Sequence, residues 1–302
     1  PRPQPHRGGP HRRDQRLAVT AGRRCARRVD CSRRALRLGF VHHQPQTAMT
    51  AVALRQESSA MPTTMSPTEF LSACTVDPAV LELRPDYRTM LVVIDGLAPA
   101  TGPEAGSRAD ELIAAAEAHA QDLLAESPAA ELPHIAAWRE AYRAFGAKPQ
   151  RTRNSLESLT RRAERGLPRV NALTDIYNAI SVLHQIPLGG EDVHRYDGPA
   201  RLIRATGDEP FDTTANGETV IEYPEPGEVV WCDGAGVTCR RWNWRQGRRT
   251  GLSDQTRTAL FILDALAPLS DEQLTAAADA LIGACSALGA EVSASTRLIS
   301  AP

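Results

Sequence analysis

A run of short apolar segments separated by turn sequences is the feature that most constrains the fold of this chain. After Pro187 the sequence passes through the segments RLIRAT, TVIEY, GEVVWCD and VTCRRWNW, with the turn sequences ATGDEP, TANGE, EPGE and DGAG between or beside them. Segments of this length and spacing predict consecutive antiparallel strands. The chain must therefore build part of its core around a sheet.

Helical sequences lie on both sides of this strand block. Apolar residues recur there at a spacing of three and four, as in Ile135, Trp138, Tyr142 and Phe145. The predicted helices cover residues 107–127, 134–146, 155–166 and 172–186 before the block, and residues 257–266 and 271–288 after it. Residues 88–97 are typical of one further, buried strand. The predicted class is α+β, with a central antiparallel strand block surrounded by helices and no doubly wound sheet.

Residues typical of helix ends support several of these boundaries. The predicted N-caps are Ser107, Asn154 or Ser155, and Ser270, which forms an S-x-x-Q capping box with Gln273. Gly146 and Gly166 are expected to end two of the helices, because glycine readily adopts the left-handed conformation common at that position.

The charge of the chain divides at about residue 64. Residues 1–64 carry 13 arginines against Asp14, Asp30 and Glu57, or 13 − 3 = +10, whereas the remainder holds 22 basic and 33 acidic residues, or −11. We expect residues 1–64 to be a basic low-complexity leader (a mis-set start, a disordered tail or a targeting peptide) and residues 65–302 to form a single domain. A body this acidic does not bind nucleic acid generally, so no DNA partner is expected, and an RNA contact requires a local basic surface.

Several functional classes lose support because their motifs are absent from the sequence. No apolar run approaches the roughly 18 residues of a membrane helix, so no membrane partner is expected. The six cysteines include no CxxC pair, which favours reduced thiols in the cytoplasm and no metal site. The GxxxxGK[ST] and GxGxxG loops and the GxSxG and HExxH motifs are also missing, so we expect no cofactor.

The segment CRRWNWRQGRRTGLSDQT, residues 239–256, is the strongest candidate for a binding site because five arginines and two tryptophans fall between Arg240 and Arg249. On a strand, Trp242 and Trp244 would share one face, and Arg241, Asn243 and Arg245 would share the other. In one interpretation the tryptophans are core and the arginines pair with the acidic body. In the other, the arginine row binds phosphate or carboxylate. The substrate-binding residues would then be Arg240, Arg241, Asn243, Arg245, Gln246 and Thr250.

A second group of polar residues precedes the strand block. Asp175 and Asn178 lie one turn apart in ALTDIYNAI, and therefore on one face of the predicted helix. The sequence GGEDVHRYDG places Glu191, Asp192 and His194 on a predicted loop that leads into the strands. His194 is either a general base that orients a water molecule or a solvated loop histidine.

Two motifs give this order of segments a family resemblance. LPRVNALTDIYN is similar to the pattern R-P-x-N-x-x-x-D-x-x-N, and RATGDE, Arg204 to Glu209, is similar to a second conserved turn. Both patterns belong to the B3/B4 domain of the bacterial phenylalanyl-tRNA synthetase β chain, and the chain resembles the free-standing B3/B4 proteins more closely still, over roughly Trp138 to Leu266. The resemblance implies an α+β fold that in the synthetase holds the editing site, where tyrosine wrongly attached to the phenylalanine tRNA is hydrolysed. Nothing resembles the aminoacylation domain, so no synthetase activity is implied.

The resemblance leads to two hypotheses about function. The first is an aminoacyl-tRNA-binding protein that edits in trans by ester hydrolysis, with tRNA or aminoacyl-tRNA as partner. His194, which takes the place of the histidine in the synthetase pattern G-Q-P-x-H-x-F-D, would be its catalytic residue, and Asn178 with the Arg240–Arg245 strand would line the pocket. In place of the Gly-rich G-V-M-G-G segment of the synthetase, this chain has CRRWNWRQ. The alternative is a non-catalytic module that binds an amino acid, a nucleotide or an RNA end.

Overall fold

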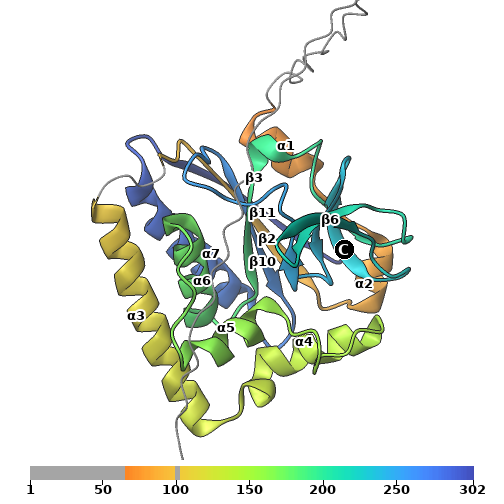
Figure 1. Cartoon of the computed structure of the whole chain (residues 1–302), viewed down its shortest axis with the longest axis horizontal. Helices are drawn as coiled ribbons and strands as arrows, with labels where there is room; N and C mark the ends of the chain where they lie inside the picture. Colours follow the sequence, from red (N-terminus) through yellow and green to blue (C-terminus); the bar gives the residue numbers. More distant parts are fainter. Residues whose placement is uncertain (1–64, 99–102) are drawn as a thin grey trace, which may run out of the picture. The chain divides into compact units, whose positions relative to one another are not determined.

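The structure is a computed structural model that describes residues 65–98 and 103–302. The predicted leader, residues 1–64, lies outside the described residues. The described chain contains a seven-stranded and a four-stranded sheet together with helices (Figure 1), which confirms the α+β class. No helix in this part of the chain combines the length and the apolar character needed to cross a membrane.

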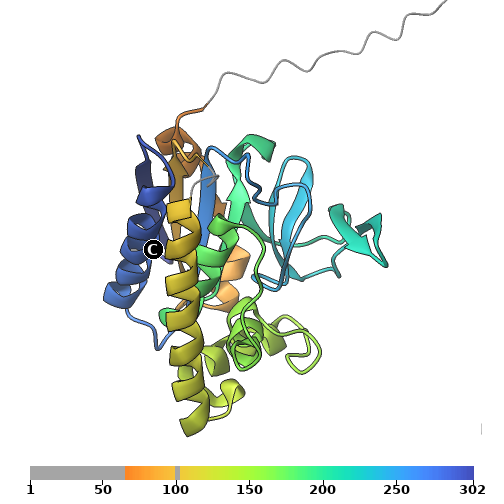
Figure 2. The same ribbon diagram turned by 60° about the vertical axis from the view of Figure 1, so that its left-hand side comes forward.

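The seven-stranded sheet contains the predicted strand block. Its order is β1-β4-β7-β8-β5-β6, and β9 pairs with β8. The strands are β1 (Thr75–Val76), β4 (Arg201–Arg204), β5 (Phe211–Ala215), β6 (Glu218–Glu222), β7 (Val229–Asp233), β8 (Gly236–Arg240) and β9 (Arg245–Gln246). Of the predicted strands, β4, β7 and β8 pair antiparallel as expected. The sheet is not purely antiparallel, because β5, which was not predicted as a strand, runs parallel to β8, and β1, from outside the predicted block, runs parallel to β4. The β5–β6 hairpin projects from the side of this sheet (Figure 2).

The four-stranded sheet is antiparallel and has the order β11-β2-β10-β3. Its strands are β2 (Arg88–Asp95), β3 (Leu188–Asp192), β10 (Ala259–Ala265) and β11 (Ser293–Ser300). The expectation of a helix over residues 257–266 was wrong, since these residues include β10. Along β10, Phe261 and Leu263 pack into the core beneath the helices, while Leu260 and Ile262 pack into the core beside the seven-stranded sheet. A strand buried on both faces is a continuous apolar run, which periodicity alone does not separate from a buried helix.

The four-stranded sheet packs against the seven-stranded sheet on one face and against helices on the other. Helices α3 (Pro103–Glu126), α6 (Ala172–Leu183) and α7 (Asp271–Cys285) pack together on that face, and the short η3 (Ser286–Leu288) follows α7. Helices α4 (Pro133–Ala144) and α5 (Ser155–Ala163) follow η1 (Ala129–Glu131), and α1 (Pro67–Ala73) and α2 (Pro78–Leu83) precede β2. The predicted helices before the strand block are thus confirmed, except that α3 begins at Pro103 and not after Ser107.

The predicted caps explain the starts of α5 and α7 and the ends of α4 and α5, whereas the predicted cap Ser107 lies inside α3. The Asn154 side chain accepts a hydrogen bond from the Glu157 backbone N–H, and Ser270 and Gln273 form the expected reciprocal capping box. Gly146 and Gly166 have φ of +91° and +93°, so both adopt the left-handed conformation expected after a helix.

Candidate functional site

A cavity of about 280 Å³ lies where α5 and α6 meet the two sheets. Its wall is built from β3, β7, β8, β9 and β10 as well as from the two helices. The apolar lining includes Leu159, Tyr177, Leu188, Trp231, Trp244 and Ile262. The polar lining includes Asn178, Glu191, Asn243, Arg245, Gln246 and Asp264. A mostly apolar pocket with a few convergent polar groups is the usual form of a small-molecule site.

Residues 239–256, which we call the tryptophan–arginine segment, reach this cavity through a tight turn and not along a strand. Strand β8 ends at Arg240, and Arg241 and Trp242 have φ of +48° and +67°. The predicted alternation of two faces from Arg241 to Arg245 was therefore wrong. Two contacts hold the turn: the Trp242 N–H donates to the Val229 carbonyl (2.6 Å), and the Arg241 N–H donates to the Glu228 carboxylate (3.1 Å).

Both tryptophans border the cavity, but the turn buries them to different extents. Trp242 is fully buried, and its ring centroid lies 5.0 Å from that of Tyr87 and 5.2 Å from that of Trp138. Trp244 is only partly buried and lies on the cavity wall between the guanidinium groups of Arg241 and Arg245, which are 4.6 and 4.7 Å from its ring centroid. Only Trp242 is thus a core residue in the sense predicted.

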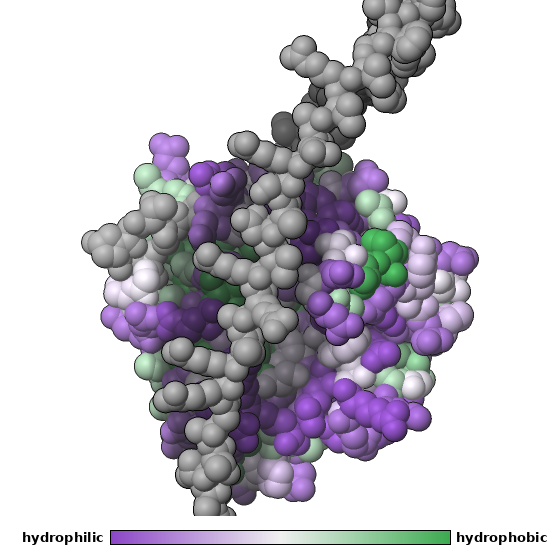
Figure 3. All heavy atoms as spheres, viewed as in Figure 1, coloured by the Kyte–Doolittle hydropathy of each residue, from purple (hydrophilic) through white to green (hydrophobic). Residues whose placement is uncertain are grey.

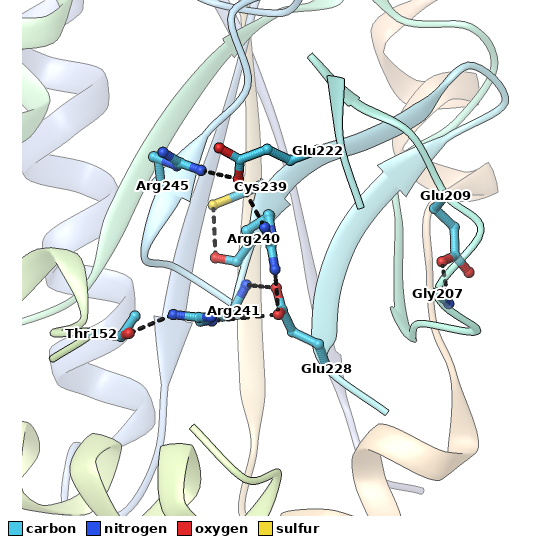
Figure 4. A network of polar contacts seen from close by, with 9 residues as sticks. All are labelled: Thr152, Gly207, Glu209, Glu222, Glu228, Cys239, Arg240, Arg241 and Arg245. Carbon is cyan, nitrogen blue, oxygen red and sulfur yellow. Dashed lines mark hydrogen bonds and ion pairs between the residues drawn. The ribbon is translucent and has the colours of Figure 1, made fainter. Parts of the chain in front are cut away.

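The arginines of the segment pair with carboxylates (Figure 4). Arg240 donates from Nε and Nη2 to the two oxygens of Glu228, each at 2.8 Å, and both side chains are almost completely buried. Arg241 also contacts Glu228 and donates to Thr152, while Arg245 donates to Glu222 at 2.6 Å. Further along, Arg248 pairs with Asp212 and Arg249 with Asp233. The arginines therefore stabilise the seven-stranded sheet by pairing with its acidic residues, as in the interpretation in which they serve the fold.

Asn243 joins the turn to a buried carboxyl group at the base of the cavity. Its Oδ1 accepts a hydrogen bond from the Tyr142 hydroxyl (2.9 Å), and its Nδ2 donates to Asp264 Oδ2 (3.1 Å). The Tyr87 hydroxyl donates to the other oxygen of Asp264 at 2.6 Å. Burial raises the pKa of Asp264 to about 7, although these hydrogen bonds favour its ionised form.

Glu191 is a second buried carboxyl group on the cavity wall. It has no exposed surface, and the Tyr196 hydroxyl donates to its Oε2. Its Oε1 forms no hydrogen bond of normal length with any described residue. Burial raises the pKa of Glu191 to about 8, and the nearby hydroxyls of Thr238 and Thr250 only partly offset that rise. At pH 7 this carboxyl group is mostly protonated and can donate a hydrogen bond.

The structure brings together some of the predicted site residues and separates others. Asn178, Asn243, Arg245 and Gln246 all line the cavity, whereas Arg240, Arg241, Thr250 and His194 lie outside its lining. Thr250 is buried behind the wall. His194 is exposed on η2 (Val193–Arg195), and its Nε2 lies 3.2 Å from the Thr258 hydroxyl.

Sequence reasoning missed Asp264, and it named Glu191 only as a loop residue without a role in the pocket. The predicted loop around Glu191 is strand β3, and Asp264 lay within the predicted helix that proved to be β10. A signal was present in the two glycines that precede Glu191. A Cβ at Gly189 would meet Gln246 Nε2 at 2.9 Å, and one at Gly190 would meet Leu252 and Phe261 at 2.7 and 2.8 Å. Paired glycines beside an acid thus mark a strand packed closely against a site.

The region that contains the cavity matches a known family. Residues 137–280 match the family model described as the B3/4 domain. This part of the chain is B3/4-like. Every residue of the cavity lining lies between Ser155 and Asp264, and therefore within the B3/4-like region. Among the described residues, no group of three or more His, Cys, Asp or Glu side chains is arranged to hold a metal ion.

A solved structure also resembles the chain. It is an N-terminal fragment of the phenylalanyl-tRNA synthetase β-subunit from Pyrococcus horikoshii, with a TM-score of 0.38 and 11% sequence identity. The alignment covers 73% of this chain and 50% of that structure, so the chain spans about half the length of the fragment. No curated protein matches the chain in sequence.

Proposed function

We propose that the cavity binds the aminoacyl end of a tRNA and that the protein hydrolyses the ester bond of mischarged molecules. The observation that carries the proposal is the cavity itself, in which Glu191 and Asp264 line a mostly apolar space of about 280 Å³. This volume is at the lower limit of the roughly 300–1,000 Å³ typical of small-molecule sites. It suits an amino-acid side chain or one ring and is too small for a whole nucleotide.

The lining suits an apolar or aromatic aminoacyl group with a polar end. Tyr177 and Trp244 supply aromatic surface, which packs well against another ring or a branched side chain. The Asn178 side chain is nearly buried and makes no hydrogen bond with another described residue, so its amide can bond to a ligand. The match of residues 137–280 to the B3/4 domain supports the same ligand class.

The chemistry proposed for the site is attack of water on the ester carbonyl. The carbonyl oxygen gains negative charge as the water oxygen bonds to the acyl carbon. The ester C–O bond then breaks, and a proton from the water passes to the ribose oxygen. A protonated Glu191 can donate a hydrogen bond to the developing oxyanion, which is the kind of contact that most strongly stabilises such a transition state. Glu191 thereby replaces His194, which lies outside the cavity lining, as the proposed catalytic residue, and its role is to donate to the oxyanion and not to orient the water.

A non-catalytic binding module is the second candidate. The observation that favours it is that the cavity lining includes no histidine, while Asp264, whose raised pKa of about 7 would suit a general base, already accepts hydrogen bonds from Tyr87 and Asn243 on its two oxygens. Such a module would bind the same ligand and leave the ester intact.

The test is release of free amino acid from a panel of mischarged tRNAs, with an amino-acid ester as a substrate that lacks RNA. Glu191→Leu removes the hydrogen-bond donor and should lower the rate by about 10²–10³-fold. Glu191→Gln keeps an N–H donor and should retain most of the wild-type rate. His194→Ala should leave the rate unchanged.

Each contrary result has a distinct meaning. A wild-type protein that binds the charged tRNA and releases no amino acid is the non-catalytic module. An unaltered rate in Glu191→Leu would remove Glu191 from the mechanism, and a loss of about 10²-fold in His194→Ala would make His194 the catalytic residue.

A further inference from the structure

The segment that carries α5 has a charge opposite to that of the body around it. Residues 143–169 hold eight basic and two acidic residues, or 8 − 2 = +6, within a body of 22 basic and 33 acidic residues, or −11. All eight basic side chains are exposed, while Glu157, one of the two acids, is completely buried. We call six of them the α5 basic surface: Lys148, Arg151, Arg153, Arg161, Arg162 and Arg165.

Four of the six cations of the α5 basic surface have no acidic partner among the described residues. Arg153 and Arg161 contact Glu157 at 3.6 and 3.0 Å. By contrast, Lys148, Arg151 and Arg165 form no side-chain hydrogen bond or ion pair with another described residue, and Arg162 only donates to a backbone carbonyl. The tryptophan–arginine segment differs in this respect, because its arginines pair with carboxylates. Cations left free on an acidic body are available to an external anion.

The helix dipole of α5 does not account for this arrangement. Basic residues in the last turn of a helix are stabilised by the partial negative charge there, which explains Arg161 and Arg162. Lys148, Arg151 and Arg153 precede the N-terminus of α5 at Ser155, where the dipole disfavours cations. Arg153 at least contacts the buried Glu157, but fold stability gives no reason for Lys148 and Arg151.

The α5 basic surface borders the cavity across one turn of α5. A groove of about 660 Å³ is lined by Arg161, Arg162 and Arg165, with Glu164 as its one acid. Ser158 lines both this groove and the cavity, so the two spaces lie on either side of one helical turn. In the view of Figure 3, the surface over α4 and α5, to the right of the grey trace, is predominantly hydrophilic.

We infer that the α5 basic surface binds the phosphate groups of a nucleic-acid strand whose 3′ end enters the cavity. The inference rests on the proposed function for the identity of that end. Guanidinium groups pair with phosphate through two parallel hydrogen bonds, and exposed cations gain affinity by releasing counterions from the strand. A strand can follow the groove past Ser158, whereas a flat lipid headgroup layer does not reach arginines that line a concave groove.

The experiment measures binding of uncharged tRNA to the full chain between about 50 and 200 mM KCl. The variant Arg151→Ala/Arg162→Ala/Arg165→Ala removes three cations without breaking an ion pair. Its affinity should fall about 10-fold or more at the lowest salt concentration. The slope of log K against log salt should become shallower by about 0.7–0.9 for each phosphate that the variant no longer neutralises. Turnover or binding of the RNA-free amino-acid ester should stay within about twofold of wild type.

The matched control is Arg108→Ala/Arg201→Ala/Arg257→Ala, which removes three exposed arginines elsewhere and makes the same change in net charge. Because residues 1–64 are present in both variants, their 13 arginines contribute equally. The control should bind tRNA within about threefold of wild type.

Three results would overturn the inference: equal losses in the two triple variants, no tRNA binding by the wild type, or a triple-variant loss seen with anionic vesicles and not with tRNA. Because the ester assay lacks RNA, it reports on the cavity separately. If the α5 triple variant loses tRNA binding and still turns over the ester normally, both proposals are supported. If the α5 triple variant alone loses tRNA binding but the wild type neither binds nor hydrolyses the ester, only the nucleic-acid surface is supported and the proposed function fails.

Discussion

The buried carboxyl group of Glu191 should make the stability of this protein fall as pH rises through the neutral range. Glu191 has no exposed surface, and burial raises its pKa from the ordinary value of 4.5 to about 8. Between these two values the folded protein keeps a proton that the unfolded chain has released. Since the folded state binds more protons there, the free energy of unfolding decreases with increasing pH. The contribution of Glu191 is complete below about pH 4.5 and is lost as pH approaches 8.

The size of the effect follows from the difference between the two pKa values. That difference is 8 − 4.5, or about 3.5, and each pKa unit corresponds to about 1.36 kcal/mol, so the upper limit is about 5 kcal/mol. Glu191→Gln removes the titration and keeps an oxygen that can accept the hydrogen bond from Tyr196. Any change in packing caused by the amide is the same at every pH. The slope of the unfolding free energy against pH, and not its absolute value, therefore reports the ionisation of Glu191.

The measurement is urea unfolding of wild type, Glu191→Gln and the exposed control Glu164→Gln at pH 5, 6.5 and 8. Relative to its own value at pH 5, the Glu191→Gln protein should be more stable than wild type by about 2–5 kcal/mol at pH 8. Asp264, whose pKa burial raises to about 7, contributes a slope of the same sign to all three proteins. Parallel curves for wild type and Glu191→Gln would refute the reasoning, because they would mean that Glu191 titrates normally in the folded state.

Two further predictions separate the parts of the tryptophan–arginine segment. Arg240→Ala should destabilise the protein by about 3–5 kcal/mol, because it leaves the carboxylate of Glu228 buried without its bidentate partner; a loss under about 1 kcal/mol in urea unfolding would contradict this. Trp242→Ala should cost about 3–5 kcal/mol through the cavity it leaves beside Tyr87 and Trp138, whereas Trp244→Ala, on the half-buried wall, should cost less and should weaken ligand binding.

Local sequence signals were sufficient for the helices before the strand block. Helical spacing placed α4, α5 and α6 close to their observed bounds, and predicted cap residues added to it at the start of α5 and at the ends of α4 and α5, because both signals act within one or two turns of the chain. Ile135, Trp138 and Tyr142 are buried on one face of α4, as their spacing predicts. Such elements depend little on what the rest of the chain does.

Strands β10 and β3 could not be predicted in the same way because their surroundings decide their conformation. Every residue of β10 is buried, so the strand lacks the alternation that identifies a half-exposed strand. β3 pairs with β10 over five residues that include Gly189 and Gly190, which carry no hydrophobic signal of their own. The cavity positions of Asp264 and Glu191, one on each of these strands, were not predicted for the same reason.

The turn at Arg241 and Trp242 shows how tertiary contacts override local preference. Positive φ is unfavourable for both residue types, at a cost of about 1–2 kcal/mol for each. The buried ion pair with Glu228 and the burial of the Trp242 indole offset that cost. These contacts involve residues more than ten positions away, on or beside β7, so the sequence of the segment alone predicts a continued strand.

This turn also separates the two kinds of polar interaction that the proposed ligand requires. It commits the arginines of the segment to internal carboxylates and leaves Asn243, Asp264 and Glu191 to face the cavity, where protonation decides the charge of the two acids. The free cations lie beyond Ser158, on the α5 basic surface. Salt screens exposed charges far more than buried ones, and pH near neutrality changes carboxyl groups of raised pKa and not arginine. A salt series at fixed pH should therefore change binding of the nucleic acid, while a pH series at fixed salt should change recognition in the cavity.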